Sequence, residues 1–319
     1  MSTNANTPQP DKASAPTGAT EHTVLKAGPR RRSSSAQGTL RWRAIESLRP
    51  EDERICYDPV ASKLMGPFWS CLNGVGFLRR RSIRQLDSEE SGMANWIIGR
   101  TKFIDDFLKE EVEGGIKQLV ILGAGYDTRA YRFSELQKQA KVFELDDMAT
   151  LKFKFARVRI AVKPLPQNVV FVPIDFTHQK LEDKLPPRIY DRSLKTMFIW
   201  EGVTMYLPAE SVDQTLAFIA GNSGQGSSVV LDYLFESVVD GTSDLTEAKK
   251  LRQTTAQAGE PLLFEIKEAS IEEFLSSRGF DVMQNLSAKS LKDAYFKGKG
   301  QQRKVFPLIA IVIAKVRQQ

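Results

Sequence analysis

The chain has 319 residues, of which 41% are hydrophobic and 26% charged, and its formal net charge is +6. These proportions are typical of a globular protein with an ample core, and they exclude a collagen-like or wholly disordered chain. Uninterrupted apolar runs stay below the ~18 residues of a membrane span. Two cysteines, Cys56 and Cys71, cannot form a disulfide framework, and two histidines are too few to complete a structural zinc site. We expect a cytoplasmic protein without a metal or a membrane-spanning segment.

The first 38 residues differ in composition from the rest of the chain. They are rich in Pro, Ser, Thr, Ala and Gly, and their five basic and two acidic residues supply half of the net positive charge. Such a segment cannot bury a core, so we predict a disordered tail over 1–38 and a single domain over 39–319. The run RRRSSS at 30–35 is typical of a kinase site or a short localisation signal, and equally of a solvated segment.

A helical cap is expected over residues 39–91, at the start of the domain. Its first part, 39–65, has a helical pattern that Pro50 and Pro59 interrupt. The second part, 66–91, contains several glycines and an arginine cluster, and we predict an irregular segment there. A long helix follows over 92–112 and ends at a pair of glycines.

Short apolar runs then alternate with helical segments. The runs lie at 118–122, 141–145, 169–172, 196–200 and 228–233. This alternation predicts a doubly wound parallel sheet, that is, an α/β fold. A charged helical region over 240–259, a helix at 270–278 and two strands at 281–286 and 305–314 complete the expected elements.

The segment 119–132, LVILGAGYDTRAYR, is the most specific motif of the chain. An apolar strand enters Gly123 and Gly125, and polar residues that can begin a helix follow. Glycine allows the backbone to approach a ligand closely or to adopt a positive φ. A strand, glycine turn and helix of this kind place a nucleotide-like ligand over the carboxyl end of the strand.

The motif lacks a third glycine near Thr128, and Asp127 places a negative charge where a diphosphate would lie. A cofactor with a ribose but no phosphate therefore fits better than a dinucleotide, and S-adenosylmethionine is the common one. The next strand ends in two acids, Glu144 and Asp146. We choose Asp146 as the acceptor of the ribose hydroxyls, with Glu144 as the alternative, because a carboxylate can accept from both hydroxyls.

Several blocks together resemble the leucine carboxyl methyltransferase-like family of S-adenosylmethionine-dependent methyltransferases. They run in family order over residues 39–233, and the C-terminal end matches more weakly. The blocks are RAIES at 43–47 with DPVA at 58–61, RTKFIDDFL at 100–108, GAGYDTRAYR at 123–132, VFELD at 142–146, PIDF at 173–176 and WEGVTMYL at 200–207.

The resemblance implies a class I methyltransferase fold, a Rossmann-like sheet of order 3-2-1-4-5-7-6 with the last strand antiparallel. It supports Asp146 as the ribose ligand, and it implies that Asp175 and the backbone of Phe176 bind the adenine. It further implies that Arg100 binds the cofactor carboxylate. Other roles follow for three residues, namely Arg43 at the same carboxylate (with Arg41 as the alternative), Glu201 at the cofactor amino group and Tyr206 in the acceptor site.

A methyl transfer from a sulfonium needs in-line placement, a desolvated pocket and an exposed nucleophile. A carboxylate acceptor needs no general base, whereas an alcohol usually does. Because His22 lies in the tail and His178 follows Asp175, a histidine base is not expected, and this favours carboxyl methylation. An Asp, Glu or Tyr base would serve a hydroxyl acceptor. Residues 79–84 contain a cluster of arginines, namely Arg79, Arg80, Arg81 and Arg84. Two interpretations are open: the cluster attracts an anionic acceptor, or it is a solvated basic surface.

The sequence thus predicts an S-adenosylmethionine-dependent O-methyltransferase that acts on a small-molecule carboxylate or hydroxyl, with Glu201 and Tyr206 nearest to the reaction. One alternative is a methyltransferase for the C-terminal leucine carboxylate of a phosphatase catalytic subunit. Another is an inactive scaffold, although all the motif residues are intact. A nucleic-acid substrate is not expected, because no stripe of basic and aromatic residues accompanies the fold.

Overall fold

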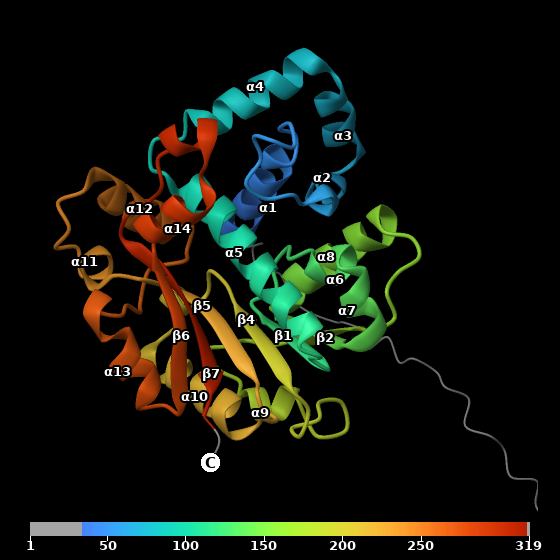
Figure 1. Cartoon of the computed structure of the whole chain (residues 1–319), viewed down its shortest axis with the longest axis vertical. Helices are drawn as coiled ribbons and strands as arrows, with labels where there is room; N and C mark the ends of the chain where they lie inside the picture. The colour runs from blue at the N-terminus through green and yellow to red at the C-terminus, as the bar shows by residue number, and fades with distance from the viewer. Residues whose placement is uncertain (1–33, 318–319) are drawn as a thin grey trace, which may run out of the picture.

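A seven-stranded sheet forms the centre of the computed structural model, which describes residues 34–317 (Figure 1). The strands lie in the order β3-β2-β1-β4-β5-β7-β6. Strands β1 to β5 pair in parallel, and β7 is antiparallel to both β5 and β6. This order and the reversed last strand confirm the class I methyltransferase fold. The bounds are β1 Gln118–Leu122, β2 Lys141–Asp146, β3 Val169–Pro173, β4 Thr196–Trp200, β5 Ser228–Leu234, β6 Phe280–Ser287 and β7 Ile309–Val316.

The central strands are buried on both faces because helices cover each side of the sheet. Successive side chains of a strand point to opposite sides, so each strand contributes to two cores. In β1, Leu119 and Ile121 belong to one hydrophobic core, and Val120 and Leu122 belong to the other. Continuous apolar runs such as LVIL therefore form strands covered by helices on each side. The covering helices are α5 Met93–Glu113, α6 Arg129–Arg132, α7 Ser134–Gln139, α8 Met148–Ala161 and α14 Ala288–Tyr295 on the first face, and α9 Leu181–Lys184, α10 Ala209–Gly221 and α13 Ile271–Ser276 on the second.

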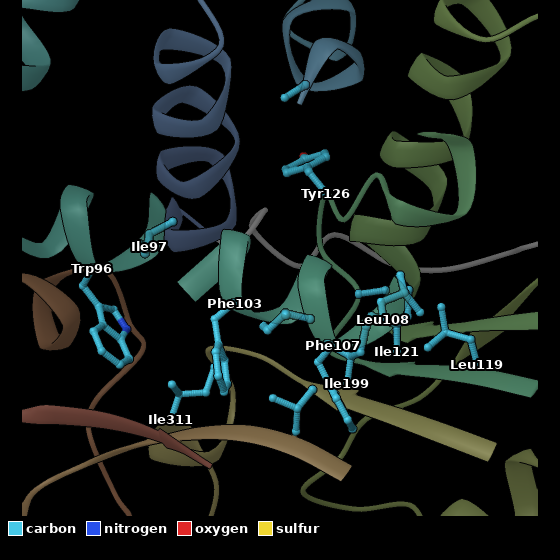
Figure 2. Close-up of a cluster of buried hydrophobic side chains, with 14 of the residues drawn as sticks. Trp96, Ile97, Phe103, Phe107, Leu108, Leu119, Ile121, Tyr126, Ile199 and Ile311 are labelled. Carbon is cyan, nitrogen blue, oxygen red and sulfur yellow. The ribbon is translucent and has the colours of Figure 1, made fainter. Parts of the chain in front are cut away.

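Helix α5 is the predicted long helix, and it lies across the sheet. Figure 2 shows Phe103 and Phe107 of this helix directed towards Ile199 of β4 and Ile311 of β7. Gly114 ends the helix, and Gly115 follows with a φ of +77°. Helix α5 packs against the sheet through its buried face. This packing places the side chain of Arg100 at the carboxyl edge of the sheet, where it contacts Glu201 after β4.

The cap consists of four helices, α1 Ser34–Glu46, α2 Pro59–Leu64, α3 Pro67–Gly74 and α4 Gly76–Asp87. The prediction of an irregular segment over 66–91 was wrong, because α3 and α4 occupy most of it. Glycines lie only at the ends of these helices, and Leu86 packs with Ile83 against a small core of the cap and α5. In Figure 1, α4 forms the outermost part of the cap, at the top of the view.

The beginning of α1 differs from the predicted boundary. Residues 34–38 belong to α1, whereas the composition predicts a tail up to residue 38. The predicted disorder of residues 1–33 lies outside the described residues. The first turn of α1 contributes Ser35, Ala36 and Gly38 to the wall of a large cavity.

Asp58 joins the cap to the glycine turn that follows β1. Its carboxylate accepts a hydrogen bond from Ala61 N at 2.9 Å, which caps α2, and Pro59 occupies the first turn of that helix. The same side chain accepts from Thr128 Oγ1 at 2.7 Å. The DPVA block therefore holds the cap against the loop of the GAGYDTRAYR block.

Two further observations concern residues 34–317 only. None of the helices there is long and apolar enough to cross a membrane. No group of three or more His, Cys, Asp or Glu side chains there is arranged to hold a metal ion.

Candidate functional site

A cavity of about 520 Å³ opens over the edge of the sheet at which β1, β2, β4 and β5 end. Ligands of open α/β sheets bind at this edge. The turn after β1, the end of β2 and the turn after β4 form one side of the cavity. The other side is formed by α1 and by α12, Thr246–Gln257, with the segment that follows it.

Gly123 and Gly125 line the cavity, and both have left-handed backbone, with φ of +68° and +45°. A Cβ at position 123 would lie 2.2 Å from Val203 Cγ2, so this glycine allows the loop after β4 to pack against the turn. A Cβ at position 125 would lie 3.5 Å from Ala36 Cβ in the cap. The glycines thus bring three chain segments together around the cavity.

Asp146, at the end of β2, lines the same cavity. Its Oδ2 accepts a hydrogen bond from Gly125 N at 2.6 Å, and its Oδ1 accepts from Asp147 N at 2.6 Å. Burial raises the pKa of the Asp146 carboxyl to about 7, although the Gly125 bond opposes this shift. A carboxylate of this kind is poised to gain hydrogen-bond donors from a ligand.

Glu144, the alternative to Asp146, lies elsewhere. It is fully buried within the sheet, and its Oε2 lies 2.7 Å from Nζ of Lys154, which is also fully buried. Because side chains alternate along a strand, Glu144 and Asp146 share a face, but only Asp146 reaches the edge where the cavity opens.

Arg100 and Glu201 lie together in the wall of the cavity, where α5 approaches the loop after β4. Glu201 Oε1 is 3.0 Å from Arg100 Nη2, and Asp232 of β5 binds Arg100 Nη1. Asp232 also accepts from Gly202 N at 2.6 Å, which fixes the loop. Burial opposes a high pKa of Arg100, but the two carboxylates outweigh it and raise that pKa. The guanidinium therefore stays charged in the buried site.

Arg129, directly after the glycine turn, makes a second set of ion pairs. It binds Asp127 through Nη1, and the same atom donates to Glu201 Oε2 at 2.8 Å. Its Nε donates to Asp105 Oδ1 of α5 at 2.8 Å. Burial alone would raise the pKa of Asp127, but Arg129 and the more distant Lys154 outweigh it and lower that pKa to about 2. Asp127 thus remains a carboxylate beside the cavity.

Arg43, and not Arg41, faces the cavity. Arg43 is 4% exposed, donates from Nη2 to the Tyr126 carbonyl at 2.6 Å and lies 3.5 Å from Asp58. Its buried Nε has no hydrogen-bond partner among the described residues. Arg41 is exposed and donates to Gln85 of α4 instead.

Phe176 lines the cavity, but Asp175 is not among the lining residues. The Asp175 carboxylate accepts from Thr177 N at 3.1 Å and lies 3.1 Å from His178 Nδ1. This arrangement forms a turn after β3. For the Asp175 side chain to bind the adenine, the turn after β3 would have to open, or the adenine would have to lie at the margin of the cavity beside that turn.

Tyr206 lies in the short helix Thr204–Tyr206 after β4 and lines the cavity near Glu260. Burial, followed by the charges of Glu260 and Asp232, raises the pKa of Tyr206 well above its usual value. Its hydroxyl therefore stays protonated at neutral pH. Oε2 of Glu260 is buried and has no hydrogen-bond partner among the described residues.

The arginine cluster on α4 does not reach this cavity. All four side chains are exposed on the outer surface of the cap, and none lines the cavity. The placement favours the interpretation as a solvated basic surface. The members are Arg79, Arg80, Arg81 and Arg84.

Sequence reasoning missed Asp232, Arg129 and Glu260. Asp232 interrupts the apolar run VVLDYL of β5, and a single acid within a buried strand is a signal that could have identified it. Arg129 stands inside the motif already singled out. Glu260 carries no local signal, because the return of the chain after α12 brings it to the cavity.

The sheet order, with a glycine turn after its first strand, defines a class I methyltransferase. The described domain resembles the crystal structure of a Thermobifida fusca protein with the provisional name of a methyltransferase, with a TM-score of 0.54 at 17% identity over 87% of this chain and 94% of the other. This likeness concerns the fold.

The sequence profile of the leucine carboxyl methyltransferase family matches residues 36–220. A Bacillus subtilis protein with the provisional name of an S-adenosyl-L-methionine-dependent methyltransferase is 27% identical over 75% of this chain and 82% of its own length. A Streptomyces coelicolor protein with the same provisional name is 31% identical over 65% and 71%, respectively. The chain belongs to the leucine carboxyl methyltransferase family and is an S-adenosylmethionine-dependent methyltransferase.

Proposed function

We propose that this protein is an O-methyltransferase that transfers the methyl group of S-adenosylmethionine to a carboxylate or hydroxyl of a small molecule. The observation that carries the proposal is one cavity whose lining includes Asp146, Arg100, Glu201 and Tyr206. A cofactor and an acceptor can meet in such a space without water.

The charges of the cavity fit this cofactor. Four acidic side chains and two arginines line it within the described residues, namely Asp127, Asp146, Glu201, Glu260, Arg43 and Arg100. S-adenosylmethionine carries a sulfonium, an ammonium and one carboxylate, so its net charge is positive, and acidic walls favour it. A diphosphate would meet Asp127, whose pKa is lowered to about 2.

In this proposal Asp146 accepts hydrogen bonds from the ribose hydroxyls, and Phe176 packs at the adenine. Glu201 binds the cofactor amino group. Arg43, whose Nε is buried without a partner among the described residues, and Arg100 bind the cofactor carboxylate. The bound cofactor supplies an activated methyl group.

The chain itself then has three tasks. The loop after β4, which Asp232 fixes through Gly202, positions Glu201. The cap excludes water, because α1 covers the cavity with Ala36 and Trp42. The Tyr206 hydroxyl, which stays protonated, can orient an acceptor oxygen by donating a hydrogen bond to it.

The test is calorimetric titration with S-adenosylmethionine and with S-adenosylhomocysteine. Binding of both is expected, and no binding at hundreds of micromolar would leave only the scaffold interpretation. Acceptors are then sought with methyl-labelled cofactor. Labelling of a peptide ending in leucine, abolished by amidation of its terminus, would instead support carboxyl methylation of a phosphatase.

We also propose that the protein is cytoplasmic, because its two cysteines cannot form a disulfide framework.

A further inference from the structure

The cavity continues beyond the proposed cofactor site into a region that we call the apolar arm. Its walls are Trp42 of α1, Ile97 of α5, Leu234 of β5, Leu251 of α12, Leu262 and Ile309 of β7. Leu234 and Ile309 pair with each other at the edge of β5 and β7. Asp146 and Phe176 lie over the other half of the sheet, because β4 and β1 separate β5 from β2. The arm is therefore distinct from the part of the cavity at Asp146 and Phe176, where the proposed function places the ribose and the adenine.

Tyr206 and Glu260 are among the polar residues that line the same cavity. The segment after α12 holds Glu260 in place, because Glu260 N donates to Thr255 O at 2.9 Å and Leu263 N donates to Met205 O at 2.8 Å. Oε2 of Glu260 is buried without a hydrogen-bond partner among residues 34–317. A buried carboxylate oxygen in this state can accept a proton donor from a ligand.

The arm offers no uncommitted cation among the described residues. Both arginines that line the cavity have acidic neighbours, Asp232 and Glu201 at Arg100 and Asp58 at Arg43, and the proposed function assigns both guanidiniums to the cofactor carboxylate. An acceptor carboxylate in the arm would lie beside the Glu260 carboxylate with the cofactor sulfonium as its one counter-charge, and in the complex with S-adenosylhomocysteine it would have none among the described residues, whereas a hydroxyl can donate to Glu260. The exposed arginines of α4 cannot compensate, because they do not line the cavity.

We propose that the methyl acceptor is an uncharged, largely apolar molecule that presents a hydroxyl group to the Glu260 carboxylate. This inference rests on the proposed function and selects the hydroxyl over the carboxylate. The acceptor oxygen forms a bond to the methyl carbon while the carbon–sulfur bond breaks and its electron pair remains on sulfur. The hydroxyl proton passes to Glu260, which acts as general base, and then to solvent.

A matched set of ligands tests the class of acceptor. The full chain is first titrated with S-adenosylhomocysteine, and the saturated protein is then titrated with 2-naphthol, 2-naphthoate and 2-naphthylmethylamine. We expect 2-naphthol to bind roughly tenfold or more tightly than 2-naphthoate, because only the carboxylate must lose its hydration without gaining a cation. Preference for the naphthoate or the amine, or no binding of any of the three, overturns the inference. Absence of S-adenosylhomocysteine binding would instead refute the proposed function.

The role of Glu260 is tested by the Glu260→Gln variant, with Glu265→Gln on the same segment as the control, since Glu265 does not line the cavity. Methyl transfer to 2-naphthol is expected to fall about 10²- to 10⁴-fold in Glu260→Gln. The affinity for S-adenosylhomocysteine should not change. Transfer to 4-nitrophenol, which ionises without help near neutral pH, should fall much less.

Equal losses for both phenols would indicate that Glu260 acts only in packing and would overturn its role as base. Wild-type rates in Glu260→Gln, or no transfer to 2-naphthol by a wild-type protein that binds S-adenosylhomocysteine, would also overturn the inference. A loss of equal size in Glu265→Gln would do the same, because that side chain lies outside the cavity.

Discussion

The guanidinium of Arg100 on α5 is bound by the carboxylate of Asp232 on β5, a residue 132 positions later in the chain. Asp232 is fully buried, and its second oxygen accepts from Gly202 N at 2.6 Å. One side chain therefore fixes both the arginine of the long helix and the loop that carries Glu201. This pair connects the core of the sheet to the proposed methionine end of the cofactor site.

The substitution Asp232→Asn should lower the free energy of unfolding by about 3–5 kcal/mol, because it leaves a buried guanidinium with one carboxylate fewer. Urea denaturation measures this change. The Lys102–Asp106 pair on the surface of α5 provides the control, since both side chains are partly exposed. Asp106→Asn should change stability by at most about 1 kcal/mol. Equal effects of the two substitutions would contradict a structural role of Asp232.

The substitution Asp146→Ala should weaken cofactor binding by about 1–3 kcal/mol, because the ribose hydroxyls lose their acceptor. Calorimetric titration with S-adenosylhomocysteine measures the affinity. Asp183→Ala, at an exposed position of α9, is the control and should bind as the wild type does. Unchanged affinity in Asp146→Ala would remove this residue from the site.

The raised pKa of Asp146 predicts a dependence of stability on pH. Its carboxyl ionises near its usual value of 3.8 in the unfolded chain and at about 7 in the folded protein. Between these values the folded protein holds a proton that the unfolded chain has released, so rising pH lowers the free energy of unfolding. The loss is complete above pH 7.

This loss is measured against Asp146→Asn, which cannot ionise at that position. Urea denaturation at about pH 4.5 and about pH 8 should show the variant gaining stability relative to the wild type as the pH rises. A difference that stays constant with pH would mean that burial does not shift this carboxyl.

Gly123→Ala should destabilise the loop, since the added Cβ would lie 2.2 Å from Val203 Cγ2 at a φ of +68°. The positive φ alone costs about 1–2 kcal/mol. Val203→Ala in the same chain should recover the part of the loss that comes from the contact but not the backbone part. Thermal unfolding of both single variants and the double variant measures the coupling, and strictly additive effects would rule the contact out.

Deletion of residues 2–33 should leave cofactor affinity unchanged, because their composition cannot form a core. Deletion of residues 2–46 removes α1, which lines the cavity with Trp42 and Arg43, and should reduce that affinity strongly. Calorimetry on both truncated proteins tests this difference. A large loss in the shorter deletion would place the tail in the site.

Local patterns were enough to predict most of the sheet. The run at 118–122 and its counterparts are apolar because both faces are covered, and this property is visible residue by residue. The run at 305–314 was displaced, since β7 covers Ile309–Val316. The glycines of residues 66–91 predict an irregular segment, but Gly74 and Gly76 only separate two helices. Their apolar residues are stabilised by contacts with α1 and α5 that no local pattern shows.

The motif GAGYDTRAYR by itself determined the place of the glycine turn and, with the acids after the next run, a choice between Glu144 and Asp146. Only the tertiary structure places Asp146 at the cavity and Glu144 beside Lys154, since a step of two residues along one face of a strand decides whether a side chain reaches the edge of the sheet. Only the tertiary structure brought Asp232 to Arg100 and Glu260 to the cavity. Those contacts join segments that are far apart in sequence. The charged side chains interact strongly only once they are buried, and this burial occurs only when the helices pack on the sheet.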